Sequence, residues 1–166
     1  VDIEKSSEAI SKGGIGNHLD KPDNLGKGDS DTEQTAVELG DKAQTINFRV
    51  TNNGTESLTH IKLTDKTLDG NHDVKEIKWT YNGKALTTNK DGALELDGKL
   101  LELPVGGYIV GTGTLESITA GEVHSDEITV SAKGTISGKT VGDKDKLYGK
   151  KPKPVNQVIK IFLPKT

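Results

Sequence analysis

Three charged residues continue an alternation of apolar residues that is typical of a β-strand. Their side chains are the candidates for a reaction in the protein interior. They are Lys5, Asp65 and Asp126. Successive side chains of a strand point to opposite faces, so residues two apart share a face. The apolar residues on the same faces are, in turn, Val1 and Ile3, Ile61 and Leu63, and Ile128 and Val130. The pattern predicts that one lysine and two aspartates point inward.

An inward lysine beside inward carboxyl groups predicts a condensation. Burial disfavours the charged forms, so the amine loses its charge and the carboxyl gains a proton. A neutral amine can then attack a carboxyl, while a second acid moves the protons, and the product is an intramolecular isopeptide bond. The alternative is that the three residues lie at strand ends and form ordinary surface ion pairs, each worth at most about 1 kcal/mol.

A second group of acidic residues supplies the hard oxygen ligands that Ca²⁺ prefers. Asp29 and Asp31, with Asp20 and Asp23, lie in a long first loop, and Asp143 and Asp145 lie near the end of the presumed domain. If the loop folds back, these carboxylates meet, and calcium is the one cofactor that we consider. Their spacing does not match a twelve-residue calcium loop, and solvated acidic loops are the alternative.

Other catalytic and metal-binding patterns are missing from the sequence. The four histidines have no metal-ligand spacing along one strand, and we expect them on the surface: His18, His60, His72 and His124. No Gly-x-Ser-x-Gly, His-Glu-x-x-His or phosphate-loop pattern occurs, and Gly111 and Gly113 fall within a strand pattern, where they allow close strand packing or a bulge. One Trp and three Tyr are too few to line a carbohydrate cleft, so we expect no enzyme.

Length and charge restrict the remaining classes. The chain of 166 residues is long enough for one domain with tails, and its net charge of −3 disfavours nucleic acid as a partner. No apolar run approaches the roughly 18 residues of a membrane-spanning helix, so we expect no membrane contact in the mature form. Cysteine is absent, so any covalent cross-link must use other side chains.

Strands and tight turns must position these residues. Five turn dipeptides interrupt the middle of the chain, namely Asn53-Gly54, Asp69-Gly70, Asn82-Gly83, Asp91-Gly92 and Asp97-Gly98. Alternation predicts strands near residues 1–5, 34–39, 44–52, 57–65, 73–81, 93–103, 107–118, 125–135 and 157–163. Residues 6–32 do not alternate and are expected outside the core, and residues 142–154 resemble a domain end followed by a spacer. The predicted strands and turns together indicate an all-β sandwich.

Three blocks resemble a repeat of bacterial surface proteins: Val1-Asp2-Ile3-Glu4-Lys5-Ser6, Phe48 to Thr55 followed by Leu63-Thr64-Asp65, and Val141 to Asp145 with Tyr148-Gly149. The family is the conserved repeat domain of unknown function in cell-wall proteins. The resemblance covers residues 1–149 and implies an immunoglobulin-like sandwich that serves as a stalk or an adhesive module. It also implies that Lys5 and Asp126 form the isopeptide bond and that Asp65 is the catalytic acid. The chain departs from the family pattern in its longer first loop and in an insertion around residues 82–99.

The tail, residues 150–166, ends in a sequence that resembles the sortase motif Leu-Pro-x-Thr: Leu163, Pro164, Lys165 and Thr166. An extended tail would present this motif to the enzyme, and we expect Thr166 to be joined to peptidoglycan. Secretion and attachment to the cell wall follow, with sortase and peptidoglycan as partners. The first hypothesis is a wall-proximal stalk module. The alternative is an adhesin that binds a host protein or glycan through residues 6–32 or 82–99.

Overall fold

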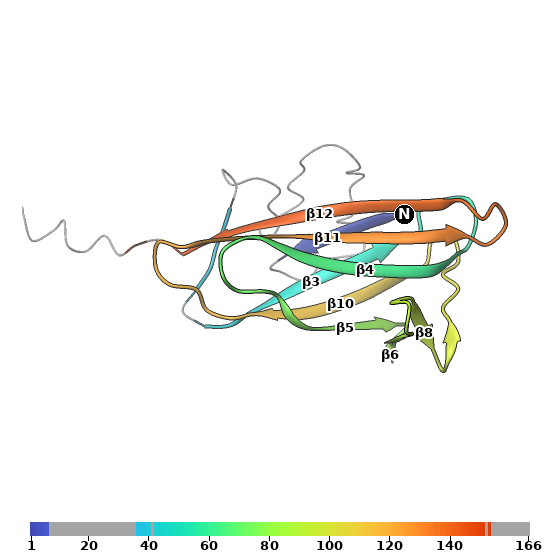
Figure 1. The fold of residues 1–166 in the computed structure, drawn as a ribbon, viewed down its shortest axis with the longest axis horizontal. Helices are drawn as coiled ribbons and strands as arrows, with labels where there is room; N and C mark the ends of the chain where they lie inside the picture. Colours follow the sequence, from blue (N-terminus) through green and yellow to red (C-terminus); the bar gives the residue numbers. More distant parts are fainter. Residues whose placement is uncertain (7–35, 41, 152, 154–166) are drawn as a thin grey trace, which may run out of the picture.

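The computed structural model describes residues 1–6, 36–40, 42–151 and 153, and within these ranges every regular element is a strand. Two sheets are stacked in separate layers, and β11, β12 and β4 lie over β3, β10 and β5 (Figure 1). The predicted all-β sandwich is therefore confirmed. None of the described residues belongs to a helix with the length and apolarity that crossing a membrane requires.

The first sheet has the order β1-β3-β10-β5-β6, and its neighbouring strands are antiparallel. Its strands are β1 (Asp2–Ser6), β3 (Gln44–Thr51), β10 (Tyr108–Leu115), β5 (Lys75–Tyr81) and β6 (Lys84–Ala85). The second sheet has the order β2-β12-β11-β4, in which β2 pairs parallel to β12. Its strands are β2 (Val37–Glu38), β12 (Thr140–Lys150), β11 (Val123–Gly134) and β4 (Leu58–Asp69). A small third sheet contains β7 (Thr87–Thr88), β8 (Leu94–Leu96) and β9 (Lys99–Leu100).

The core lies between the two large sheets and consists of the alternate residues of their strands. The fully buried members include Ile46, Phe48, Val50, Ile109, Ile128, Val130 and Leu147. The two glycines of β10 allow close packing, as predicted. A Cβ atom at Gly111 would overlap the ring of Trp79 on β5, and one at Gly113 would press on Val74.

The strands predicted from the sequence omit the long strand β12, which contains most of residues 142–154 and ends close to the predicted domain end near Gly149. Its inward positions carry Asp143 and Asp145, which are 7% and 5% exposed, ahead of the buried Leu147. Polar residues at inward positions hide the apolar alternation on which strand prediction depends. The folded part extends to Lys151, whose N–H donates to the Glu122 carbonyl at 3.1 Å. The expected strand at 157–163 lies outside the described residues.

The predicted turns are confirmed in three hairpins, at residues 82–83, 91–92 and 97–98, and the one predicted at Asn53-Gly54 takes another form. Residues 82–83 and 97–98 have positive φ angles, and the second pair divides the expected strand 93–103 into β8 and β9. At Asn53-Gly54 the loop is held instead by hydrogen bonds of the preceding residue, Asn52. The buried Asn52 side chain donates to the Glu56 carbonyl at 2.9 Å and to the Leu103 carbonyl at 3.0 Å, and it accepts from the Gly54 N–H at 3.1 Å.

Replacing Asn52 with alanine should lower the free energy of unfolding by about 2–3 kcal/mol, because buried backbone groups lose their partners. Urea denaturation followed by tryptophan fluorescence measures the change. Asn53→Ala is the matched control, since Asn53 is exposed and its replacement should stay within about 0.5 kcal/mol of wild type. Equal stabilities of the two variants would show that the Asn52 amide does not hold the loop.

Candidate functional site: a buried lysine between two aspartates

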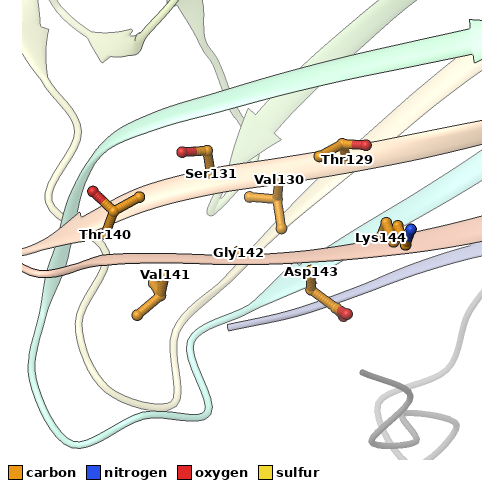
Figure 2. Close-up of a pocket in the computed structure, with 8 residues that line it drawn as sticks. All are labelled: Thr129, Val130, Ser131, Thr140, Val141, Gly142, Asp143 and Lys144. Carbon is orange, nitrogen blue, oxygen red and sulfur yellow. The ribbon is translucent and has the colours of Figure 1, made fainter. Parts of the chain in front are cut away.

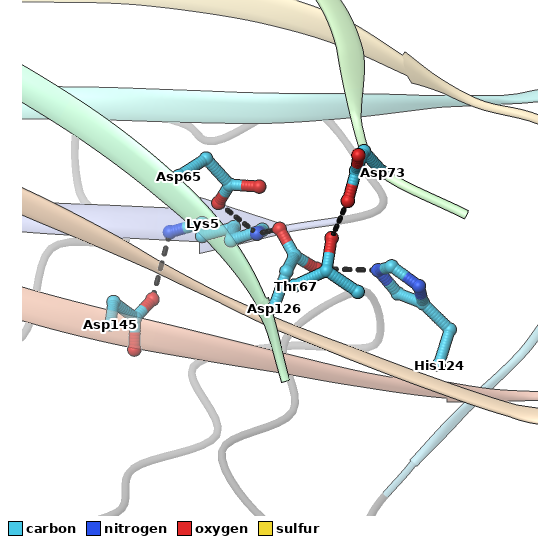
Figure 3. A network of polar contacts seen from close by, with 7 residues as sticks. All are labelled: Lys5, Asp65, Thr67, Asp73, His124, Asp126 and Asp145. Atoms are coloured by element: carbon cyan, nitrogen blue, oxygen red, sulfur yellow. Dashed lines mark hydrogen bonds and ion pairs between the residues drawn. The ribbon is translucent and has the colours of Figure 1, made fainter. Parts of the chain in front are cut away.

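The strands place Lys5, Asp65 and Asp126 at one point in the interior. Asp65 and Asp126 lie on the paired strands β4 and β11, where Asp65 is opposite Ile128 and Asp126 is opposite Thr67. Lys5 comes from β1 at the edge of the other sheet, and β1 lies against β12 and β11. Figure 3 shows the lysine amine between the two carboxyl groups. The Lys5 and Asp126 side chains are 0% exposed and that of Asp65 is 4% exposed, so all three point inward as the alternation predicts.

Two carboxylates of β12 fix the strand that carries Lys5. One edge of β1 pairs with β3, and on its other side the Ile3 N–H donates to Asp143 Oδ2 at 2.9 Å and the Lys5 N–H donates to Asp145 Oδ2 at 2.8 Å. Carboxylates that accept backbone N–H groups form strong, charge-assisted bonds. Asp143 and Asp145 thus join the two sheets where the lysine sits, a role that no sequence pattern indicated.

The proposed calcium ligands do not come together in the described part of the chain. Asp143 and Asp145 take up the backbone contacts of β1, while Asp29 and Asp31, with Asp20 and Asp23, lie outside the described residues. No group of three or more His, Cys, Asp or Glu residues within the described ranges is arranged to hold a metal ion.

The lysine amine contacts both carboxyl groups. The Lys5 Nζ atom lies 2.6 Å from Asp65 Oδ1 and is in direct contact with Asp126 Oδ2. Below it, the Phe48 ring centroid is 5.3 Å away. One nitrogen therefore has a carboxyl group on each side and an apolar ring beneath it.

Burial changes the protonation of the amine and of one acid. Desolvation lowers the pKa of Lys5 to about 8, although the nearby Asp65 carboxylate opposes this change. At pH 7 roughly one amine in ten is then neutral, whereas a lysine with an ordinary pKa is neutral in fewer than about one molecule in a thousand. Desolvation also raises the pKa of Asp65, and the effect of Lys5 opposes this change.

His124 is a site residue that the sequence reading missed. We expected all four histidines on the surface, but the His124 side chain is 0% exposed, and its Nε2 atom lies 2.8 Å from Asp126 Oδ1. The signal was present, because His124 shares the strand parity of Asp126 and Ile128. His60 is exposed as predicted, His72 is one-third exposed, and His18 lies outside the described residues.

Two further hydrogen-bonded pairs of polar side chains lie near Lys5, Asp65 and Asp126. Thr67 and Asp73 are hydrogen-bonded to each other, as Figure 3 shows, and the Ser125 hydroxyl donates to Asp69 Oδ2 at 2.6 Å. These four side chains are therefore hydrogen-bonded to one another rather than to Lys5, Asp65 or Asp126.

A shallow hollow of about 460 Å³ lies over β11 and β12, and Lys5 is not among its lining residues (Figure 2). Its lining residues are Thr129, Val130, Ser131, Thr140, Val141, Gly142, Asp143 and Lys144. Asp143 is the acidic group among them, and its carboxylate already accepts the Ile3 N–H. We assign no ligand to this hollow.

Comparisons with known proteins add little to this geometry. No protein-family model matches the chain, and no curated protein matches it. Among solved structures, it is similar to part of a family 123 glycoside hydrolase from Clostridium perfringens, with 12% identity and a TM-score of 0.33. The similarity covers 66% of this chain and 21% of the hydrolase, so the chain spans about a fifth of that protein's length.

Proposed function

We propose that this domain is a wall-proximal structural stalk module of a sortase-anchored bacterial surface protein, and that an isopeptide bond between Lys5 and Asp126 stabilises it. The observation that carries the proposal is the buried Lys5 amine in contact with both the Asp126 and the Asp65 carboxyl groups. A buried lysine between two acids is costly as an ion pair and is better accounted for as a reactive group.

The proposed reaction joins the two side chains with loss of one water. Asp126 enters the reaction as the protonated acid: the lone pair of the neutral Lys5 Nζ attacks its carboxyl carbon, and a carbon–nitrogen bond forms. Asp65 accepts a proton from the nitrogen and returns a proton to the departing carboxyl oxygen, which leaves as water. Asp65 ends in its starting state, so the reaction needs no cofactor and occurs once per molecule.

A bond at this place has a mechanical consequence. Lys5 lies on β1 and Asp126 lies on β11, so the bond closes residues 6–125 into a loop of 120 residues. Tension applied to the two ends of the domain passes from β1 to β11 through the bond and bypasses this loop. A module in which only the residues after Asp126 can extend under load suits a stalk that holds a more distal domain away from the cell wall.

The sequence of the tail supports the anchoring part of the proposal. Leu163, Pro164, Lys165 and Thr166 match the sortase motif, and they lie outside the residues that the structure describes. Sortase and peptidoglycan are the proposed partners, and a secreted, wall-anchored location follows from them. A chain extended by Gly-Gly after Thr166 should, with a sortase and a labelled triglycine nucleophile, lose the Gly-Gly segment at the Thr166–Gly bond and gain the label, and its Thr166→Ala variant should not.

The wild-type protein should weigh one water less than its sequence, because amide formation expels one water. Intact mass spectrometry measures this difference, and tandem spectra of a protease digest should contain one branched peptide that joins Lys5 to Asp126. Asp126→Ala is the control and should have its full sequence mass. A wild-type protein of full mass would overturn the cross-linked stalk.

Binding assays separate the stalk from the adhesin. A stalk module should resist protease and show no saturable binding to host-matrix proteins or to a glycan array. Saturable binding that is lost when residues 6–32 are shortened would instead identify the domain as an adhesin.

A further inference from the structure

We propose that His124 is a catalytic residue of isopeptide formation: its Nε2–H group holds Asp126 Oδ1 as the carbonyl oxygen and stabilises the negative charge that develops on that oxygen. The inference rests on the proposed function, and it assigns a fourth residue to the reaction. The geometric basis is the 2.8 Å contact between His124 Nε2 and Asp126 Oδ1, made on the carboxyl oxygen that Lys5 does not contact.

The surroundings of the imidazole determine which nitrogen carries its proton. His124 Nδ1 is buried and has no hydrogen-bond partner in the part of the chain described by the structure. A buried N–H donor without an acceptor is costly, so the neutral ring places its proton on Nε2, where Asp126 Oδ1 accepts it. Desolvation, with a smaller effect of the nearby Lys5, lowers the pKa of His124 to about 4, so the ring is neutral at pH 7.

The two oxygens of Asp126 thereby acquire different roles. Oδ1 receives the His124 hydrogen bond, and Oδ2 contacts the Lys5 amine, which also contacts Asp65. When Nζ attacks the carboxyl carbon, the electron pair of the C–Oδ1 π bond moves onto Oδ1, and the Nε2–H group stabilises this charge. The pair then returns to re-form the carbonyl, and Oδ2, which carries the acid proton of Asp126, leaves as water after Asp65 transfers to it the proton taken from Nζ.

This role predicts that a hydrogen-bond donor matters more than the shape of the ring. His124→Phe fills the same interior space without a donor and should slow bond formation by about 10²–10³-fold, the usual effect of removing one oxyanion donor. His124→Gln restores an amide N–H and should retain much of the wild-type rate. Ser125→Ala is the structural control, since it removes a buried hydrogen bond on the same strand without touching Asp126.

The rate can be measured during a single round of folding. Each chain is made in a cell-free reaction, aliquots are stopped in acid, and the fraction that has lost one water is determined by intact mass. Far-ultraviolet circular dichroism of each product shows whether the sheets have formed. Slow linkage in folded His124→Phe, with fast linkage in His124→Gln and Ser125→Ala, is the expected result.

The outcomes distinguish the role of His124 from the proposed isopeptide-linked stalk on which it rests. If wild type loses a water and folded His124→Phe loses it equally fast, His124 has no catalytic role and the cross-linked stalk stands. If His124→Phe fails to fold, a His124→Gln rate as slow as that of a His124→Ala protein refutes the donor role. If wild type keeps its full mass, both the bond and the role of His124 are refuted.

Discussion

Lys5→Met should give a protein of full sequence mass that unfolds roughly 10–20 °C below wild type. Methionine keeps the length and apolar stem of lysine but has no nucleophile, so the 120-residue loop between β1 and β11 stays open. By the relation used for disulfides, closing a loop of this size stabilises a protein by about 4–5 kcal/mol. For a domain of this size each kcal/mol corresponds to about 2–4 °C in Tm.

Differential scanning calorimetry, with intact mass measured on the same sample, checks this result. Lys62→Met is the matched control, because Lys62 is an exposed lysine on β4 and its replacement should leave both mass loss and Tm near wild type. A Lys5→Met protein that melts within a few degrees of wild type would show that Lys5 contributes no cross-link.

The same pair of proteins should differ more strongly under force. When the chain is pulled from its two ends, the closed loop of 120 residues is unavailable in wild type and free in Lys5→Met. A fully extended chain spans about 3.3–3.6 Å per residue, so the variant should release roughly 400 Å more contour length. Equal extensions in single-molecule pulling would rule out a load path through Lys5 and Asp126.

Asp65→Asn should leave the two bonding partners in place and still prevent the bond. The amide keeps the shape of the carboxyl but cannot accept a proton from the Lys5 amine and return one to the leaving oxygen. Loss of general acid–base catalysis costs typically 10²–10⁴-fold in rate. The freshly folded variant should therefore have its full sequence mass and lose water only over a much longer time.

Asp73→Asn is the control for this change. Asp73 is a nearby, exposed acid that contacts Thr67 rather than the lysine, so its amide variant should link at the wild-type rate. Intact mass at successive times after folding measures both proteins. Complete linkage of the Asp65→Asn protein at the earliest time point would show that Asp65 takes no part in the reaction.

Much of the fold follows from alternation and turn chemistry, because both act over a few residues. The apolar residues of β3 and β11 alternate clearly, and the pairs at 82–83 and 97–98 need the positive φ angles that Asn, Asp and Gly tolerate. The same rule placed Lys5, Asp65 and Asp126 inside, because a period of two holds for charged residues as it does for apolar ones.

What only the tertiary structure decided is which inward groups meet. Sequence alone determined an all-β chain with three inward charged residues, since each of these properties depends on local neighbours. It did not reveal β12, because its inward Asp143 and Asp145 are satisfied by the backbone N–H groups of Ile3 and Lys5, 140 residues away. Nor did it place His124 against Asp126, because a contact between inward side chains depends on how the strands pair and stack across the sandwich.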